Sequence, residues 1–180
     1  MRKVVLYQLL SLDGVAEEPS DWVFDSDDAI FDNLGRVLAT QDDVLLGRGT
    51  YEYWVDYWPT SDVEPFATFI NSTPKHVFSS TPLPTPWENS TQVSTSAAEH
   101  VADLKQQTGG DIGIHGSIRL ASSLLQARLV DELRLVVAPA IAGHGRRLFG
   151  DDELQKLEAV DVDRSPSGAL LLHYRVVAGA

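Results

Sequence analysis

Residues 43–54 read Asp-Val-Leu-Leu-Gly-Arg-Gly-Thr-Tyr-Glu-Tyr-Trp, and this stretch decides the class of the fold. Residues 43–46 form a short run of nearly continuous apolar character, which is typical of a strand covered on both faces of a sheet. The run stops at Gly47, and Thr50 supplies a hydroxyl that can cap a short helix through Trp54. A buried strand that leads directly into a helix is the unit of an α/β protein, so we expect that class here.

The same alternation continues on both sides of this stretch. Further apolar or β-branched runs predict strands at residues 4–10, 76–79, 92–94, 112–115 and 132–138. Helical spacing of apolar residues predicts helices at residues 28–40, from 97 to the glycine pair 109–110, and at 117–126, the last with Ser117 as its cap. Residues 157–163 and 169–177 predict an antiparallel pair, because Pro166 and Gly168 between them suit a tight turn. We therefore expect a mixed sheet that is parallel in the middle and ends in a hairpin.

The composition is that of an ordinary globular protein. The chain has 180 residues, of which 43% are hydrophobic and 22% are charged. This length is enough for one compact domain and too short for two of full size, so we expect a single domain over residues 1–180. The cysteine count is zero, which excludes disulfide scaffolds, cysteine nucleophiles and thiolate metal sites. We assign no metal site.

The charge balance excludes two kinds of partner. Lys and Arg number 14 and Asp and Glu number 26, which gives a net charge of −12. Such a chain is repelled by nucleic acid and by anionic membranes unless a basic patch overrides the field, and the longest basic run is the pair Arg146 and Arg147. The apolar N-terminal stretch ends at residues 11–14, too early for an export signal. We expect a cytoplasmic protein that binds neither nucleic acid nor membrane.

Three predicted strand ends share one design, a Gly or Ser turn with exposed backbone N–H groups. They lie at residues 47–50, 79–81 and 115–117. Such groups at a helix start attract phosphate oxygens, and Arg48 adds a charged fork that matches a phosphate. Together the turns suit a ligand with several phosphates spread along it, such as a dinucleotide. Each turn also has an ordinary explanation: a solvated arginine, a serine-rich loop and a helix cap. Neither a GxGxxG fingerprint nor a P-loop is present.

Several segments, in one order along nearly the whole chain, resemble a known family. They are residues 11–14 (Ser-Leu-Asp-Gly), 47–52 (Gly-Arg-Gly-Thr-Tyr-Glu), 57–59 (Tyr-Trp-Pro), 116–121, 129–133 and 139–149. The chain resembles the dihydrofolate-reductase-like family that includes the reductase half of the riboflavin-biosynthesis deaminase–reductase, here as a stand-alone member. The resemblance implies a three-layer α/β fold, with a mostly parallel central sheet, flanking helices and a C-terminal antiparallel hairpin.

The resemblance also implies an NADPH-dependent oxidoreductase. Such an enzyme transfers a hydride to a small heterocyclic or carbonyl substrate, as in the pyrimidine reductase step of riboflavin biosynthesis, and it forms a homodimer. The residues that match cofactor-binding positions are Trp22, Gly47, Arg48, Thr50, Ser79, Ser80, Gly116, Ser117, Ile118, Arg119 and Leu120. Within this set the resemblance places Ser79 and Ser80 near the ribose 2′-phosphate and Trp22 near the nicotinamide. Trp22 is also interpretable as a loop tryptophan that plugs the edge of the core.

The substrate side has fewer matching positions. Asp13 ends the first strand beside the implied nicotinamide pocket and is the leading catalytic candidate, although Asp-Gly is also a common turn. Ser20, Asp27 and His115 are the further candidates. Asp25, Asp27 and Asp28 all lie at a helix start, and each could cap that helix or bind substrate as the folate-binding acid of dihydrofolate reductase does.

Two positions depart from the riboflavin-pathway reductases. His115 stands where those enzymes have an acid that touches the substrate, and Val15 stands where they often have Lys or Arg. Both departures weaken the expectation of a pyrimidine-ribose-phosphate substrate and leave the cofactor positions intact. His115 titrates near neutral pH and could donate a proton, or it could be structural. Two alternatives therefore stay open: a dimeric nucleotide-binding module of the same fold without turnover, and a dihydrofolate reductase.

Overall fold

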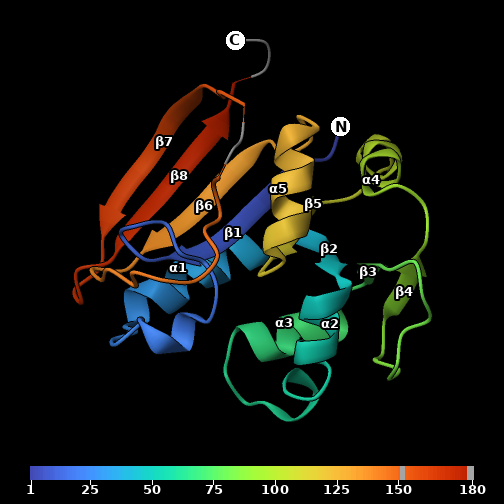
Figure 1. Cartoon of the computed structure of the whole chain (residues 1–180), viewed down its shortest axis with the longest axis horizontal. Coiled ribbons are helices and arrows are strands. Elements are labelled where there is room, and N and C mark those ends of the chain that lie inside the picture. The colour runs from blue at the N-terminus through green and yellow to red at the C-terminus, as the bar shows by residue number, and fades with distance from the viewer. Residues whose placement is uncertain (151–152, 178–180) are drawn as a thin grey trace.

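The computed structural model describes residues 1–150 and 153–177, and it shows an eight-stranded sheet with helices on both faces (Figure 1). The strands are β1 (Val4–Leu10), β2 (Gln41–Gly47), β3 (Lys75–Phe78), β4 (Ser90–Val93), β5 (Asp111–His115), β6 (Glu132–Val137), β7 (Leu157–Arg164) and β8 (Leu170–Val176). The α-helices are α1 (Asp28–Leu38), α2 (Arg48–Trp54), α3 (Phe66–Ser72), α4 (Ala97–Gln106) and α5 (Ile118–Gln126). Two 3-10 turns, η1 (Pro19–Asp21) and η2 (Trp58–Thr60), complete the described elements.

The strand order is β4-β3-β2-β5-β1-β6-β8-β7. Neighbouring strands from β4 to β6 pair in parallel, whereas β8 pairs antiparallel with β6 and β7 antiparallel with β8. The expected mixed sheet with a C-terminal hairpin is thus confirmed. Because β2, β3 and β5 are parallel neighbours, their carboxyl ends meet at one edge of the sheet.

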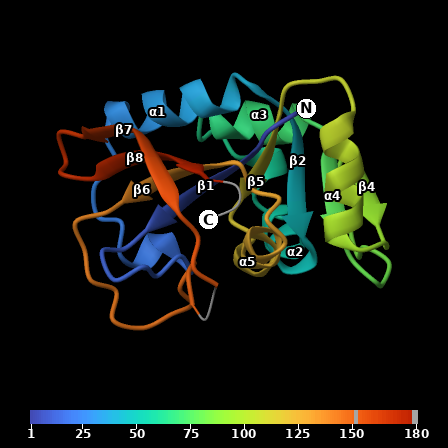
Figure 2. The same ribbon diagram turned by 90° about the horizontal axis from the view of Figure 1, so that it is seen from above.

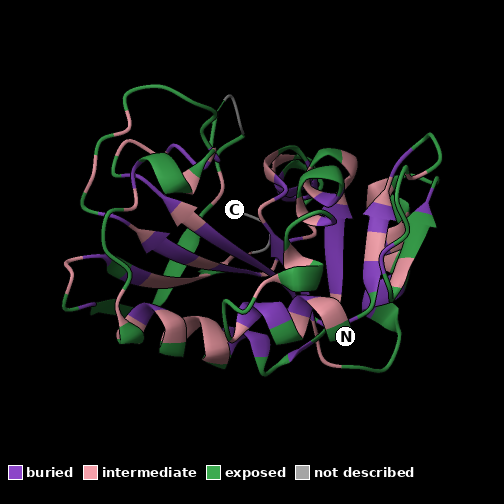
Figure 3. Ribbon diagram, turned by 90° about the horizontal axis from the view of Figure 1, so that it is seen from below, coloured by how far each residue is buried: buried purple, intermediate pink, exposed green. Residues whose placement is uncertain are grey.

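The helices form the two outer layers of the fold. Figure 2 shows α1 and α3 on one side of the sheet and α4 and α5 on the other. Alternation along β1 explains both layers, since Leu6 packs in the core under α4 and α5 while Tyr7 packs in the core under α1. Figure 3 shows the strands in the middle of the sheet as mostly buried. None of the helices in residues 1–150 and 153–177 combines the length and the apolar character that crossing a bilayer requires.

Several details differ from the sequence-based expectation. Helix α2 begins at Arg48, with Gly47 at the N-cap position, so Thr50 lies inside the first turn and does not cap it. Helix α1 ends at Leu38, and β7, not β6, is the longest strand. Helix α3 was not predicted. The turn between β7 and β8 is as expected, since Gly168 adopts a left-handed φ of 93°.

Candidate functional site

The three turns singled out in the sequence lie at the carboxyl ends of adjacent strands. Residues 47–50 follow β2, residues 79–81 follow β3, and residues 115–117 end β5. Two hydrogen bonds connect them: the Gly47 N–H donates to Ser117 Oγ at 3.0 Å, and Arg48 Nη1 donates to Ser79 Oγ at 3.0 Å. We call these residues the three-turn cluster. The structure therefore brings the three turns into one connected surface.

The helices that start in this cluster have N-termini without side-chain caps. Ser117 occupies the N-cap position of α5, but its hydroxyl accepts from Gly47 instead of from the first turn of its own helix. Gly47 at the N-cap of α2 has no side chain to offer. The first-turn N–H groups of both helices, side by side, are therefore left to an external acceptor, and the helix dipoles favour an anionic one.

Arg48 crosses from α2 to the end of β3. Besides Ser79, its guanidinium donates to the carbonyl oxygens of Thr81 at 3.0 Å and Pro82 at 2.9 Å, and it pairs with the Glu52 carboxylate at 2.8 Å. This contact fixes a full positive charge on the loop that follows β3. Ser80, one residue further along, is exposed on that loop.

The residues at the start of α5 reach this cluster in different ways. Gly116 adopts a φ of 71°, and the Trp54 ring lies directly against it. Arg119 is exposed, whereas Leu120 is buried in the core and Ile118 packs against that core. Ile118 and Leu120 can therefore contribute only backbone groups to a ligand. Thr50 lies nearby, since its methyl group would contact a Cβ atom at Gly116.

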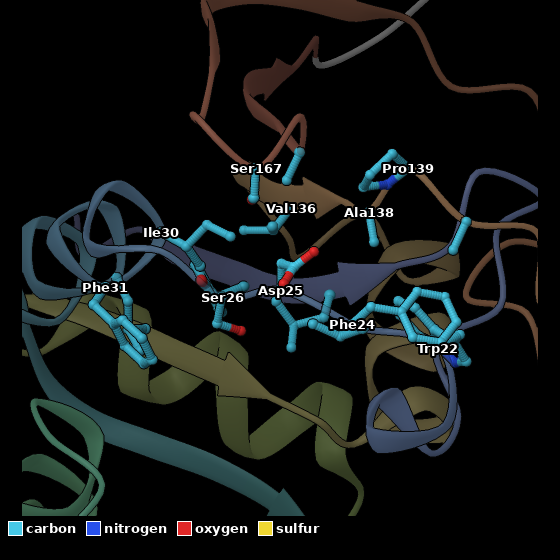
Figure 4. Close-up of a pocket in the computed structure, with 16 residues that line it drawn as sticks. Trp22, Phe24, Asp25, Ser26, Ile30, Phe31, Val136, Ala138, Pro139 and Ser167 are labelled. Atoms are coloured by element: carbon cyan, nitrogen blue, oxygen red, sulfur yellow. The ribbon is translucent and has the colours of Figure 1, made fainter.

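A cavity of about 270 Å³ lies on the α1 side of the sheet. Its floor is formed by Tyr7 of β1 and Val136 of β6, and its walls come from α1 and from residues 22–26 (Figure 4). Trp22 is buried, donates its indole N–H to the Glu17 carbonyl oxygen at 3.0 Å, and also lines a smaller cavity of about 150 Å³. Because β1 and β6 follow β5 in the sheet, the larger cavity and the three-turn cluster share the carboxyl edge.

The structure does not support a proton-donating role for Asp13. Its carboxylate accepts hydrogen bonds from the Ser11 hydroxyl at 2.6 Å and from the backbone N–H groups of Ala142 and Gly143 at 3.0 Å each. These hydrogen bonds, above all the one from Ser11, lower the pKa of Asp13 to about 2. Asp13 therefore stays ionised at neutral pH, and it is absent from the residues that line either cavity. Its role here is to tie the end of β1 to the loop after β6.

His115 is likewise a structural residue. It is buried between the rings of Tyr7, Phe66 and Phe69, and its Nε2 lies 2.7 Å from Gln41 Oε1. Burial lowers the pKa of His115 to about 3, so the ring is neutral at physiological pH. His115 does not line the cavity, which removes it from the substrate-side candidates.

The structure distinguishes the acidic residues at the start of α1. Asp27 caps the helix, accepting from the Ile30 N–H at 3.2 Å, and it also accepts from the Ser167 N–H at 2.7 Å. Asp25 lines the cavity, and no hydrogen bond or ion pair to its carboxylate occurs within residues 1–150 and 153–177. Ser20 is exposed on η1 and lines neither cavity. The cavity carboxylate is therefore Asp25, which the sequence could not separate from its two neighbours.

The strand order and the two helical layers define a dihydrofolate-reductase-like α/β protein. The chain belongs to the RibD C-terminal domain family, whose family model matches residues 2–171. This confirms the resemblance found in the sequence. The family is the reductase domain of riboflavin biosynthesis enzymes, so membership supports a function of the pyrimidine reductase type.

Individual relatives agree with this assignment. The Bacillus subtilis protein YyaP, which is uncharacterised, is 28% identical over 182 residues, covering 96% of this chain and 94% of YyaP. A solved structure described as a riboflavin biosynthesis protein of Shewanella sp. PV-4 has a TM-score of 0.80 at 18% identity and covers 97% of this chain and 99% of its own. The Thermotoga maritima diaminohydroxyphosphoribosylaminopyrimidine deaminase/5-amino-6-(5-phosphoribosylamino)uracil reductase has a TM-score of 0.71 at 17% identity, covering 98% of this chain and 57% of its own. At these identities the two solved structures show a shared fold.

Proposed function

We propose that the protein is an NADPH-dependent reductase of a small heterocyclic or carbonyl compound. The observation that carries the proposal is the three-turn cluster, in which two uncapped helix N-termini and one arginine are joined by hydrogen bonds. The cluster lies on the same edge of the sheet as a cavity with a largely apolar lining. A phosphate-binding edge next to a ring-sized cavity suits a nicotinamide dinucleotide and a small acceptor.

The residues of the cluster fit such a cofactor. The first-turn N–H groups of α2 and α5 would hold the pyrophosphate, with Gly47 and Gly116 allowing close approach of the backbone. Arg48 and the hydroxyls that follow β3 would hold the 2′-phosphate. When bound, the cofactor supplies a hydride to a C=N or C=O carbon. The protein aligns the two rings and keeps water from them.

A proton must reach the neighbouring nitrogen or oxygen of the substrate. Asp13 and His115 are not available for this step, because Asp13 is held as an anion and His115 is buried outside the cavity. Asp25 is the carboxylate in the cavity wall. We assign the proton to Asp25 or to a water molecule that it holds.

Replacement of Arg48 tests the cofactor assignment. Arg48→Ala is expected to weaken NADPH binding by about ten- to a hundredfold, since a charge-assisted hydrogen bond to the 2′-phosphate is lost. NADH lacks that phosphate, so its binding is expected to change much less. Quenching of tryptophan fluorescence measures both affinities, because the chain has four tryptophans and Trp54 lies against Gly116.

Glu52→Gln is the matched control for Arg48→Ala. It removes the carboxylate that pairs with Arg48 and leaves the arginine in place, so NADPH binding should be unchanged or tighter. Equal weakening of NADPH and NADH by Arg48→Ala would contradict the 2′-phosphate assignment. Absence of saturable NADPH binding below millimolar concentration would remove the reductase. NADPH binding without oxidation across pterins, pyrimidines, quinones and carbonyls would indicate a binding module, and a dihydrofolate assay tests the remaining alternative.

We also propose that the protein forms a homodimer through β7. This strand lies at one edge of the sheet and is exposed along its whole length. It carries the exposed apolar side chains of Leu157, Val160 and Val162. An exposed, partly apolar edge strand favours pairing with another chain.

A further inference from the structure

The cavity next to the three-turn cluster has an unusual balance of charge. Its lining includes the aromatic rings of Trp22, Phe24 and Phe31, the phenol of Tyr7 and the carboxylate of Asp25. Among the described residues that line it there is no lysine, arginine or histidine. A ligand in this cavity would therefore meet flat apolar surfaces and one negative charge.

The segment that forms the cavity wall extends this negative field. Residues 17–28 contain six acidic residues and no basic one: Glu17, Glu18, Asp21, Asp25, Asp27 and Asp28. Arg146 neutralises Glu17 at 2.6 Å, and Asp27 is occupied by backbone N–H groups. In the part of the chain that the structure describes, no lysine or arginine forms an ion pair with the other four. His144 lines the smaller neighbouring cavity, but so do Glu17, Glu18 and Asp21.

This field works against a phosphorylated substrate. Proteins bind phosphate groups with arginine, lysine or bundled N–H donors, and the cavity lining supplies no cationic side chain. A phosphate here would instead face several uncompensated carboxylates, and clefts of one sign repel ligands of the same sign. The volume also matters, because about 270 Å³ is below the roughly 300–1,000 Å³ of sites for larger organic ligands. A ring with an attached ribose phosphate suits this cavity poorly.

We propose that the cavity binds a small planar ring that carries no phosphate and is neutral or cationic, with Asp25 accepting hydrogen bonds from ring N–H groups. This inference rests on the proposed reductase function and names its substrate class. Trp22 and Phe24 on one side and Phe31 on the other supply the faces between which a flat ring can lie (Figure 4). The bond reduced is a C=N or C=O of that ring, or one conjugated to it. Its carbon gains hydride and its nitrogen or oxygen gains a proton, while NADPH becomes NADP⁺.

Two features of Asp25 make it the contact that selects the ring. Its carboxylate lines the cavity, and within the described residues it has no protein partner, unlike the carboxylates of Asp13 and Asp27. A carboxylate accepts from two adjacent N–H groups in one plane, which matches an amino-substituted ring nitrogen. Asp25 thus recognises N–H donors and, with its acidic neighbours, disfavours anions.

The test compares ligands that differ in charge, by calorimetry on the full chain at neutral pH. Pyridoxine and pyridoxine 5′-phosphate share one ring and differ only in the phosphate, and 2,4-diaminopyrimidine offers paired N–H donors and gains a proton readily. Pyridoxine is expected to bind roughly tenfold or more tightly than its phosphate, because several carboxylates repel the phosphate at once. Asp25→Asn is expected to weaken 2,4-diaminopyrimidine about tenfold, the loss of one charge-assisted contact.

Asp28→Asn is the matched control, since Asp28 is exposed in the first turn of α1 and does not line the cavity. It should leave all three affinities nearly unchanged. The proposal is overturned if the phosphorylated ring binds as tightly as pyridoxine, if Asp25→Asn and Asp28→Asn have the same effect, or if no ring binds at millimolar concentration. NADPH titration of the same samples separates the two levels. NADPH binding together with any of these outcomes overturns the substrate class alone, whereas absent NADPH binding overturns the reductase function.

Discussion

At the scale of single residues, Gly116 has the most constrained position in the three-turn cluster. Its φ of 71° lies in the left-handed region, which other residues adopt at a cost of roughly 1–2 kcal/mol. A Cβ atom at this position would lie 2.9 Å from the Trp54 ring, closer than real carbon contacts. The end of β5 therefore needs glycine both for its backbone and for the space it leaves.

Gly116→Ala is accordingly expected to lower the free energy of unfolding by about 1–3 kcal/mol, from backbone strain and overpacking together. Denaturant unfolding followed by tryptophan fluorescence measures this. Gly49→Ala serves as the control, because Gly49 lies in α2 with no heavy atom within 4 Å of an added Cβ. Alanine favours the helix there, so that variant is expected to be more stable by about 0.5–1 kcal/mol. Equal effects of the two substitutions would contradict the constraint at Gly116.

Other residue roles could not be read from the sequence. Asp13 and His115 were reasonable candidates by position, but their partners are distant in the chain. Asp13 is held by the backbone of Ala142 and Gly143, and His115 by the side chain of Gln41. A local pattern shows that a residue can ionise, whereas its pKa depends on contacts that only the folded chain provides. The glycine and arginine of residues 47–50 were easier to recognise, since their position after a buried strand is itself local.

At the scale of elements, the apolar runs predicted the strands well and the helices less completely. The run from Val4 to Leu10 corresponds to β1 residue for residue. Helix α3 was missed because its seven residues are too few for a periodic pattern. Tertiary contacts stabilise it instead, including the Lys75 ammonium, which donates to the carbonyl oxygens of Ile70 at 2.7 Å and Thr73 at 3.0 Å.

Lys75 gives this element a measurable pH dependence. Burial lowers the pKa of its ammonium from 10.5 to about 8, although the charge of Glu88 opposes part of the shift. The unfolded chain therefore binds more protons than the folded chain between these two values, so the contribution of Lys75 to stability rises with pH across that window. Lys75→Met removes this contribution. The stability of the natural chain relative to the variant is expected to increase by about 1–3 kcal/mol between about pH 8 and pH 10.5.

Denaturant unfolding at the two ends of that pH range measures the difference. Lys156→Met is the control, since Lys156 is exposed and its substitution should give a difference that does not depend on pH. Using differences between variants cancels the titration of other groups, such as Tyr7, whose pKa is raised by burial. A constant difference between the natural chain and Lys75→Met would show that the amine keeps its ordinary pKa.

At the scale of the whole molecule, the two edges of the sheet differ in how they meet solvent. At one edge, β4 has four residues and ends at the buried Val93. At the other edge, β7 has eight residues, all exposed. A long exposed edge strand is usually shortened, covered or charged in a protein that stays monomeric. The proposed homodimer through β7 provides the missing cover and leaves the carboxyl edge of the parallel strands open to ligands.

Val162→Asp tests this arrangement, because Val162 is 54% exposed on β7 and a buried carboxylate would oppose pairing. The natural chain is expected to sediment as a dimer in analytical ultracentrifugation, and the variant as a monomer or with a dissociation constant raised about tenfold or more. Val63→Asp is matched in chemistry and lies in the loop between η2 and α3, where Val63 is 40% exposed, so it should leave the dimer intact. Because β7 is separated from β1 by β6 and β8, Val162→Asp should also leave NADPH affinity unchanged. A natural chain that sediments as a monomer, or a dimer that survives Val162→Asp, would place the contact elsewhere or remove it.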